Sequence, residues 1–315
     1  MTDVDREIST PPSIAGPDSI ASFAEHRGLL EAVAYRVLGS MVDAQDVVQD
    51  AWLRWSGVDP AGILDPEGYL VRITTRLAID QLRSARARRE AYVGPWLPEP
   101  IRTTPDVADR VELADSVSTA VLLVLEALTP IERAVFVLRE AFGYSYAEIA
   151  EFVDRQEPAV RQIAHRARNA VAARRRRYDT DIETRRVATE RFLAACVGGD
   201  LEALMAVLAP GVTMISDGGG RTYAPRKPII GREAVARAIL KLTRQAPEGT
   251  RPFIAPLNGG PGIVLTASGP VLAATLHLRD GVIEMLHVVS NPAKLTHVRH
   301  GNPIRVSRIA LLSRP

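Results

Sequence analysis

Apolar residues recur at helical spacing through much of the first 177 positions of this chain. In "MVDAQDVVQDAWLRW" (41–55) they fall at i, i+3, i+4, i+7, i+8 and i+11, which predicts one buried helical face. "DPEGYLVRITTRLAIDQLRSARARRE" (65–90) repeats the period, and Asp65 or Pro66 can start that helix. The next stretch, "AYVGPWLPEPIRTTPDVADRVE" (91–112), contains four prolines and therefore predicts a linker.

Residues 144–171 predict a short helix, a tight turn and a second helix. The turn falls at Asp154 and Arg155, where one residue needs a left-handed conformation that Asp tolerates. The second helix, in "RQEPAVRQIAHRAR" (155–168), buries one apolar face and turns cationic and amide side chains outward. This helix-turn-helix pattern favours DNA binding. The outward candidates for base or phosphate contact are Arg161, Gln162, His165, Arg166 and Arg168.

The pattern changes after residue 180. Two helices, a strand running into the glycines of "GVTMISDGGG", and a third helix are followed by four alternating strands between Gly-rich turns. Asp200 is expected to cap the second of these helices. Helices followed by antiparallel strands predict an α+β domain with a curved sheet wrapped on helices.

Charge and cysteine content narrow the class of protein. Residues 1–180 carry 22 basic and 27 acidic side chains, and residues 181–315 carry 17 and 10. The basic side chains of the first part cluster in 72–89 and 155–177, which suits local phosphate binding better than the net charge of +2 suggests. A single cysteine, Cys196, and a polar N-terminus predict a cytoplasmic protein without disulfides. The longest apolar run (120–128) is too short for a membrane span.

Three of these blocks resemble a known family. "DAQDVVQDAWLRW", "YLVRITTRLAIDQLRSARARR" and "ALTPIERAVFVLREAFGYSYAEIAEFVDRQEPAVRQIAHRAR" are similar, in order and spacing, to the σ2 and σ4 domains of extracytoplasmic-function (ECF) sigma factors. "WLPEP" (96–100), "DGGG" (217–220) and "NPAKL" (291–295) resemble motifs of the SigJ type, which carries a SnoaL-like C-terminal extension. Arg76 departs from the Asn common in the family, as do Arg221 from Lys and Ala293 from an acidic residue.

The resemblance implies a multidomain fold class: two all-α sigma domains, then a cone-shaped α+β domain of the SnoaL-like, or NTF2-like, class. The implied segments are a tail (1–20), the σ2 helical bundle (21–90), the linker (91–112), the σ4 helix-turn-helix domain (113–177), the SnoaL-like domain (183–300) and a second tail (301–315). The implied function is promoter-specific transcription initiation as a sigma factor of RNA polymerase, not enzymatic catalysis.

The resemblance also implies partners and residues. Core polymerase is expected to bind through its β′ clamp and β subunit, and promoter DNA is the second partner. The polymerase-binding candidates are Asp43, Asp46, Gln49, Asp50 and Arg54. The candidates for the −10 element are Arg72, Arg76, Arg83 and Arg86, and the 158–171 helix is expected to read the −35 element. We expect Asp80 to be partly buried and paired within the fold.

The C-terminal domain is expected to regulate the sigma domains in place of a separate anti-sigma factor. Residues 181–315 carry a net positive charge and residues 1–180 a net negative charge, and these opposite charges favour association of the two parts. The expected contact residues are Trp96, Leu97, Pro98, Glu99, Pro100, Asp217, Gly218, Gly219, Gly220, Asn291, Pro292, Lys294 and Leu295. Trp96 between two prolines suits an anchor at this interface, or equally a residue packed on its own domain.

Other functions stay open from the residues alone. Asp217, Tyr223, His277 and His287 are the candidates for acid/base chemistry in a SnoaL-like pocket, but turn and structural roles explain them more simply. No cofactor or metal site is indicated, and a small-molecule ligand is compatible with the domain without being identified. The main alternative is a stand-alone ligand-sensing helix-turn-helix regulator, which leaves 41–55 and 65–90 without a role.

Overall fold

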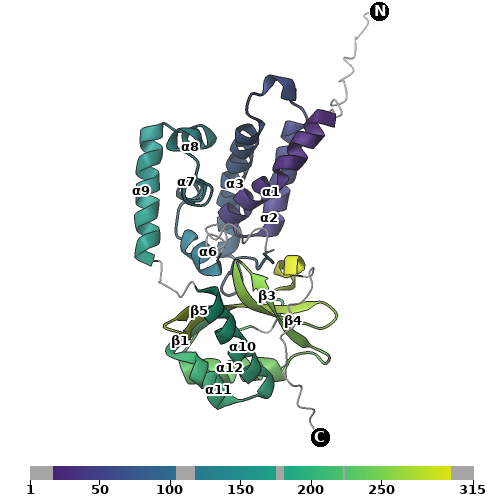
Figure 1. The fold of residues 1–315 in the computed structure, drawn as a ribbon, viewed down its shortest axis with the longest axis vertical. Helices are drawn as coiled ribbons and strands as arrows, with labels where there is room; N and C mark the ends of the chain where they lie inside the picture. The colour runs from purple at the N-terminus through teal and green to yellow at the C-terminus, as the bar shows by residue number, and fades with distance from the viewer. Residues whose placement is uncertain (1–16, 104–117, 175–180, 223, 299–315) are drawn as a thin grey trace, which may run out of the picture.

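The computed structural model describes residues 17–103, 118–174, 181–222 and 224–298. Seven α-helices of the described residues form a helical half, and a mixed sheet with three helices forms a C-terminal domain (181–298), as Figure 1 shows. The chain thus has the predicted class, two helical units and an α+β domain. Its first helix begins at Pro17, within the segment expected to be a tail.

The helical half consists of two units. The first unit contains α1 (Pro17–Leu38), α2 (Met41–Trp55), the 3-10 turn η1 (Pro60–Gly62) and α3 (Pro66–Glu90). The second unit contains α6 (Thr119–Leu125), α7 (Pro130–Glu140), α8 (Tyr146–Val153) and α9 (Glu157–Arg174).

Capping side chains set where these helices begin. Ser40 caps α2, Asp65 caps α3 with Pro66 following, and Thr129 and Ser145 form capping boxes with Glu132 and Glu148. Each cap satisfies backbone N–H groups that the first helical turn leaves unpaired. The predicted start of the 65–90 helix is confirmed.

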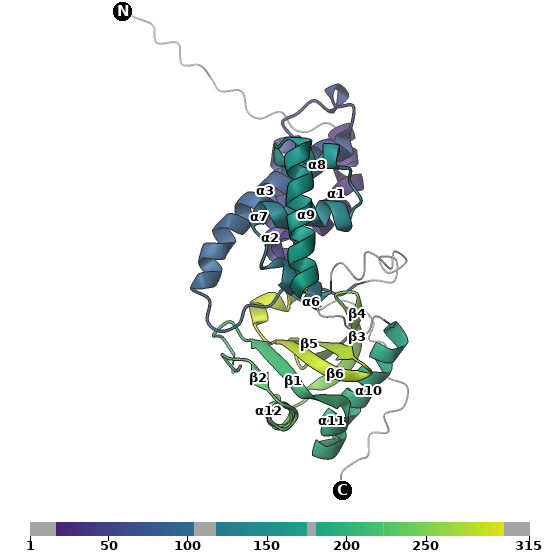
Figure 2. The same cartoon turned by 90° about the vertical axis from the view of Figure 1, so that its left-hand side faces the viewer.

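One apolar core joins the two helical units. Buried residues of α1, α2 and α3, among them Leu30 and Trp55, belong to the same cluster as buried residues of α7, α8 and α9, among them Leu138 and Ile149. The helix α7 lies against α1 and α3, and α8 lies against α3, whereas α9 packs on the outer side of α7 and α8, as Figures 1 and 2 show. Separating the two units would therefore expose apolar surface to water.

The C-terminal domain is built on a six-stranded sheet of order β2-β1-β6-β5-β4-β3. Its elements are α10 (Ile182–Gly198), α11 (Leu201–Val207), β1 (Leu208–Asp217), β2 (Ile229–Ile230), α12 (Arg232–Arg244), β3 (Arg251–Leu257), β4 (Gly260–Thr266), β5 (Pro270–Arg279), β6 (Val282–Val289), η2 (Pro292–Lys294) and η3 (Thr296–Val298). Asp200 caps α11, as predicted. The strands β3 to β6 pair antiparallel, as predicted, and β1 adds to β6 in parallel.

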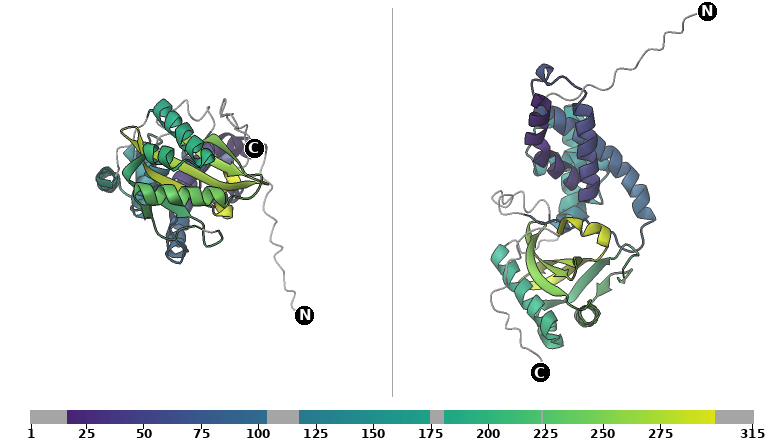
Figure 3. Two further views of the ribbon diagram at one scale, coloured as in Figure 1. Left: turned by 90° about the horizontal axis from the view of Figure 1, so that it is seen from below. Right: turned by 90° about the vertical axis from the view of Figure 1, so that its right-hand side faces the viewer.

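The two faces of the sheet have different coverings. Helices α10, α11 and α12 cover one face and enclose an apolar core around Phe192, Met214 and Leu276. The other face is turned toward the helical half, as Figures 2 and 3 show. There a smaller core contains Leu97 of the linker with Val289, Leu295 and Val298 of the C-terminal domain. The linker is therefore packed between the two halves of the molecule.

Candidate promoter-binding faces and interdomain hub

The turn between α8 and α9 has the conformation that its sequence predicts. Asp154 ends α8 with φ of 55° and ψ of 59°, in the left-handed region. The turn lets α9 cross α8 with Val160, Ala164 and Ala167 buried against the second helical unit. The opposite side of α9 is exposed and carries the five residues predicted for DNA contact: Arg161, Gln162, His165, Arg166 and Arg168.

Three of the arginines on this face pair with carboxylates of the same unit. Arg161 pairs with Glu157 of its own helix, Arg166 lies 3.5 Å from Glu132, and Arg168 lies 3.1 Å from Glu140. Exposed pairs of this kind contribute about 0–1 kcal/mol each. Phosphate groups can therefore replace these carboxylates at little cost.

The arginines predicted on α3 have different surroundings. Arg72 is half-buried, with its guanidinium 4.9 Å from the ring centre of Tyr69. Arg83 is exposed and pairs with Asp80 at 2.9 Å. Asp80 is itself 70% exposed, so the expectation that it is partly buried was wrong. The side chain of Arg86 lies outside the described residues.

Arg76 connects α3 to the end of α8. Its Nε donates to the main-chain carbonyl of Phe152 and its Nη2 to that of Glu151, both at 3.0 Å. Carbonyls in the last turn of a helix have no intrahelical donor and carry partial negative charge, so a guanidinium is a favourable cap. Arg76, which the sequence predicted to contact the −10 element, therefore bonds the second helical unit to the first.

The outer face of α2 is an exposed mixture of charge and apolar surface. Asp46, Gln49, Asp50 and Arg54 are exposed, as a docking face requires. Val42 and Leu53 are also exposed on it, at 43% and 61%. Asp43 lies at the margin of this face, half-buried, where it accepts a hydrogen bond from Gln81 of α3 at 3.3 Å.

A buried carboxylate joins the linker to the C-terminal domain. Asp217, at the end of β1, is fully buried, and its Oδ2 accepts the main-chain N–H of Leu97 at 2.9 Å and the ammonium of Lys294 at 2.6 Å. Its Oδ1 accepts the hydroxyl of Tyr92 and the N–H of Gly219. A buried carboxylate is tolerated because donors occupy its lone pairs. We call these residues, with Trp96 and Asn291, the interdomain hub.

Two cations, one from the hub and one from α3, lie against the ring of Trp96. The Nζ of Lys294 lies 4.1 Å from the Trp96 ring centre and also donates to the carbonyl of Leu97 at 2.6 Å. The Arg89 guanidinium, from the end of α3, lies 3.6 Å from the same centre. Burial lowers the pKa of Lys294 to about 8, although Asp217 opposes the shift. Trp96 thus anchors an interface between domains and is not packed on its own domain alone.

The loop formed by residues 217–220, which we call the glycine loop, fits closely against this hub. Gly219 has φ of +58°, and a Cβ there would lie 2.3 Å from the Asn291 side-chain nitrogen and 2.9 Å from the Tyr92 hydroxyl. Gly220 faces Val93 of the linker, 3.1 Å from where its own Cβ would be. Glycine is required at position 219 both for its backbone conformation and for this close approach.

Glu99 forms a second connection. Its carboxylate accepts the N–H of Met41 at 2.7 Å, at the start of α2, and lies 2.7 Å from Nδ1 of His297 in η3. His297 also contacts Gln45 of α2 at 3.3 Å. Pro98 and Pro100 are buried on either side of Glu99. The C-terminal domain therefore reaches the first turns of the helix expected to bind polymerase.

The structure brings the "WLPEP", "DGGG" and "NPAKL" segments together, and it adds residues that the sequence did not single out. Tyr92, Arg89 and His297 are among them. Asn258, in the β3–β4 turn, donates to the Tyr35 hydroxyl of α1 at 2.6 Å and accepts the N–H of Ile101 at 3.2 Å. The one available signal was the "NGG" turn motif at 258–260, which marks a hairpin but not its partner.

The described candidates for acid/base chemistry have different hydrogen-bond partners. His277 and His287 contact each other at 3.0 Å on the sheet face turned toward the helical half, whereas Asp217 belongs to the hub. Burial lowers the pKa of both imidazoles, that of His287 to about 3. Tyr223 lies outside the described residues. Within the described ranges, His, Cys, Asp and Glu side chains form no cluster suited to a metal ion.

None of the described helices has both the length and the apolar composition that a membrane crossing requires.

Comparisons with known proteins match these features. Residues 23–88 match the family Sigma-70 region 2, and residues 118–171 match Sigma-70, region 4. The ECF RNA polymerase sigma factor SigJ of Mycobacterium tuberculosis is 36% identical over 304 residues, 92% of this chain and 96% of that protein. The probable ECF RNA polymerase sigma factor SigI of the same organism is 35% identical over 285 residues, 89% and 95% of the two chains.

A solved structure extends the likeness to three dimensions. The crystal structure of the Mycobacterium tuberculosis ECF sigma factor SigJ superposes with a TM-score of 0.70 at 32% identity, covering 88% of this chain and 98% of that one. The agreement includes both helical units and the C-terminal domain. On this sequence identity and coverage, the chain belongs to the ECF RNA polymerase sigma factors.

Proposed function

We propose that this sigma factor binds core polymerase through α2, contacts the −10 element through α3 and reads the −35 element through α9. We further propose that its C-terminal domain regulates the step that makes both DNA-binding helices available. The function in promoter-directed transcription initiation follows from membership of the ECF sigma-factor family. The residue roles are supported by the exposed cationic face of α9, the arginines of α3 and the exposed face of α2.

The spacing of promoter elements supports an opening step. Elements at −35 and −10 are about 25 base pairs apart, or about 85 Å at 3.4 Å per base pair. Here α3 and α8 share one core and Arg76 bonds them directly. The segment 91–118 between α3 and α6, fully extended, can span roughly 90 Å. Simultaneous contact with both elements therefore requires the units to separate and the linker to extend.

The observation that carries the regulatory proposal is the bonding of Asp217 to the linker at Leu97. While this bond and those of Lys294 hold residues 92–97 on the C-terminal domain, the linker cannot extend between the sigma units. Docking of the linker therefore favours the compact form, and its release favours the form that can span a promoter. Another contact of the same domain, His297 with Gln45, reaches the helix proposed to bind polymerase.

Run-off transcription with core polymerase tests this proposal, using DNA from upstream of the protein's own gene. The comparison includes the full chain, Asp217→Asn, the matched exposed variant Asp280→Asn and a chain ending at Tyr178. We expect Asp217→Asn to change the transcript yield at least threefold while Asp280→Asn leaves it unchanged. An unchanged yield for Asp217→Asn contradicts the regulatory role. Failure of the full chain to bind core polymerase contradicts the polymerase-binding role of α2.

We also infer that regulation by this domain takes the place of a separate anti-sigma factor. The chain then works in the cytoplasm, where polymerase and promoter meet, as a non-enzymatic protein without a cofactor. The Asp217 carboxylate is occupied by hydrogen-bond donors of the hub and the two histidines contact each other, which supports a structural role for all three residues. A stand-alone helix-turn-helix regulator is not favoured, because it leaves α2 and α3 without a role; co-purification with core polymerase distinguishes the two.

A further inference from the structure

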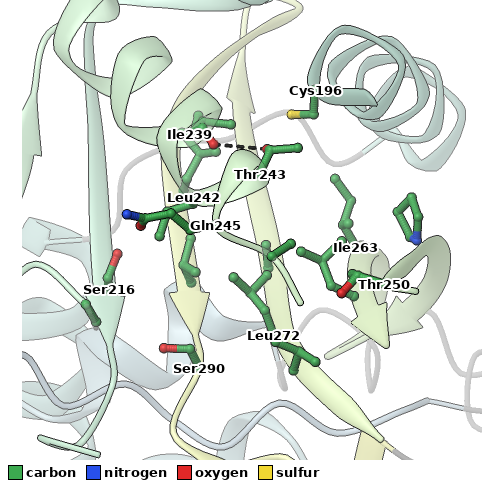
Figure 4. Close-up of a pocket in the computed structure, with 18 of the residues that line it drawn as sticks. Cys196, Ser216, Ile239, Leu242, Thr243, Gln245, Thr250, Ile263, Leu272 and Ser290 are labelled. Carbon is green, nitrogen blue, oxygen red and sulfur yellow. Dashed lines mark hydrogen bonds between the residues drawn. The ribbon is translucent and has the colours of Figure 1, made fainter. Parts of the chain in front are cut away.

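The C-terminal domain encloses a cavity of about 460 Å³ between its sheet and helices α10 and α12 (Figure 4). The lining is mainly aliphatic and aromatic, with Phe192, Met214, Ile239, Leu265, Leu272 and Leu286 among its members. None of the described lining residues is Asp, Glu, Lys, Arg or His. Cavities of this size accommodate small organic ligands, and this lining favours a neutral one because it would leave a charged group unpaired.

The cavity contains one hydroxyl without a partner. Ser216 of β1 is 3% exposed, and its Oγ has no hydrogen-bond partner among the described residues. The neighbouring hydroxyls are satisfied: Thr243 donates to the Ile239 carbonyl at 3.0 Å, and Thr222 contacts Ser290 at 2.8 Å. Burying a hydroxyl without a hydrogen-bond partner is unfavourable. A ligand oxygen that bonds Ser216 would remove that penalty.

Cys196 is the titratable side chain among the described lining residues. Burial raises the pKa of its thiol to about 12, so it remains uncharged at physiological pH. Figure 4 shows Ser216 and Ser290 at one side of the cavity and Cys196 and Thr250 toward the other. The cavity thus has an uncharged apolar body and a hydrogen-bonding side at Ser216.

We propose that this cavity binds a neutral, largely apolar small molecule with a hydrogen-bond acceptor directed at Ser216. Binding of that molecule changes how tightly the hub holds the linker. The second part rests on the proposed function, because it assigns a signal to the regulatory contact described above. The first part concerns the C-terminal domain alone.

The route from cavity to hub is short. Ser216 and Asp217 are adjacent on β1 and point to opposite faces of the sheet, as successive strand residues do. Ser290 and Asn291 repeat this arrangement after β6, and the N–H groups of both donate to the Asp217 carbonyl at 2.8 and 3.1 Å. A ligand that moves Ser216 or Ser290 therefore moves the backbone that positions the Asp217 carboxylate.

A second, smaller cavity lies next to the first and shares several of its lining residues. It has a volume of about 230 Å³ and lies between linker residues 93–95 and the glycine loop. Ser216, Thr222, Ala224 and Pro225 line both cavities. The same side chains thus face the proposed ligand on one side and the linker on the other.

Binding can be measured on the full chain without polymerase. Nile red, a neutral fluorescent probe, should bind with one site. Ala274→Phe in the cavity floor and Ala246→Trp at its helical side should each weaken binding at least tenfold, because they fill the space. The control Ile230→Trp introduces a large aromatic ring at an exposed residue outside the cavity and should bind as the natural chain does. Equal binding by all four proteins overturns the cavity as the site.

A matched ligand pair tests the role of Ser216. Benzophenone and diphenylmethane differ by a carbonyl that can accept a hydrogen bond. We expect benzophenone to displace Nile red at a concentration at least fivefold lower than diphenylmethane, and Ser216→Ala to abolish that preference. An unchanged preference in Ser216→Ala overturns the assignment of Ser216 as the polar contact.

Hydrogen–deuterium exchange tests the coupling. Saturation with Nile red should change exchange at least twofold in peptides covering 217–222 and 92–97, and the change should be absent in Ala274→Phe. Binding without any change in these peptides overturns the coupling. None of these three measurements contains polymerase or DNA. A failure of the chain to initiate transcription therefore contradicts the proposed function without affecting the result for the cavity.

Discussion

The carboxylate of Asp217 accepts the main-chain N–H of Leu97 at 2.9 Å, across 120 residues of chain. This bond attaches a linker between two sigma units to a domain that follows both of them. Lys294 completes the attachment from the far end of the same domain, by bonding the Asp217 carboxylate and the Leu97 carbonyl. Changes at these three residues therefore affect the position of the linker directly.

Replacing Gly219 by Ala should release the linker. The new Cβ would meet the Asn291 side chain and would also require a positive φ. Gly281→Ala is the matched control, because Gly281 has φ of +76° with open space around its Cβ position. The backbone penalty alone is about 1–2 kcal/mol. We expect Gly219→Ala to lose more stability than Gly281→Ala in urea unfolding and to speed exchange in 92–97. Equal losses would mean that the close approach contributes nothing.

Trp96→Ala should weaken docking of the linker more than Trp96→Phe does. The ring lies between the Arg89 and Lys294 cations, and cation–π contacts contribute about 0.5–2 kcal/mol each when partly desolvated. Phenylalanine retains an aromatic face, so part of the attraction should persist. Exchange rates at 92–97 and transcript yield measure the effect. If the alanine and phenylalanine variants behave alike, the flanking cations do not stabilise the interface.

Acid should destabilise the C-terminal domain through its paired histidines. Burial lowers the pKa of His287 from 6.5 to about 3, and that of His277 also falls. Between pH 6.5 and 3 the unfolded chain therefore binds more protons than the folded domain, so stability falls as pH drops. At pH 5 the loss is about 2 kcal/mol for His287. Urea unfolding at pH 7 and pH 5 measures it.

The control for this acid effect uses other histidine substitutions. His277→Gln with His287→Gln should flatten the dependence of stability on pH, whereas His165→Gln, on the exposed face of α9, should leave it as in the natural chain. An unaltered dependence in the double variant would assign the acid sensitivity to other groups.

Arg76→Ala should loosen the contact between α3 and α8. The guanidinium donates to two carbonyls in the last turn of α8, and losing hydrogen bonds from a charged donor costs about 1–3 kcal/mol. Arg83→Ala removes an exposed pair with Asp80 and should cost less than about 1 kcal/mol. Unfolding of the two variants, with exchange at 151–154, measures the difference. Comparable losses would show that Arg76 does not hold the two units together.

Two residues on α9 should differ in how they affect promoter binding. Arg166→Ala should weaken binding on all sequences and reduce the salt slope by about 0.9 if it contacts one phosphate. Gln162→Ala should instead reduce discrimination at one base pair by about 1–3 kcal/mol. Titration of the polymerase complex on promoter variants at several salt concentrations separates the two effects. Loss of discrimination with Arg166→Ala alone would reverse the two assignments.

Local physics explains what could be predicted from the sequence. The apolar spacing of α2, α3 and α9 specified which face each helix buries, because a helix places residues three and four apart on one side. Asp154 predicted its own left-handed turn, since few other residues tolerate that conformation. The three short motifs indicated which segments meet, but not through which atoms.

Only the tertiary structure decided the contacts between distant segments. Asp80 follows the apolar side of its helix in the sequence, yet it is exposed and paired with Arg83. Arg76 caps a helix that begins 70 positions later, and Asn258 reaches Tyr35 across 223 residues. Such partners depend on how whole domains pack, which no local period encodes. The amino-acid sequence thus determined the elements and their exposed faces, while folding determined that a carboxylate near a glycine loop would hold the linker.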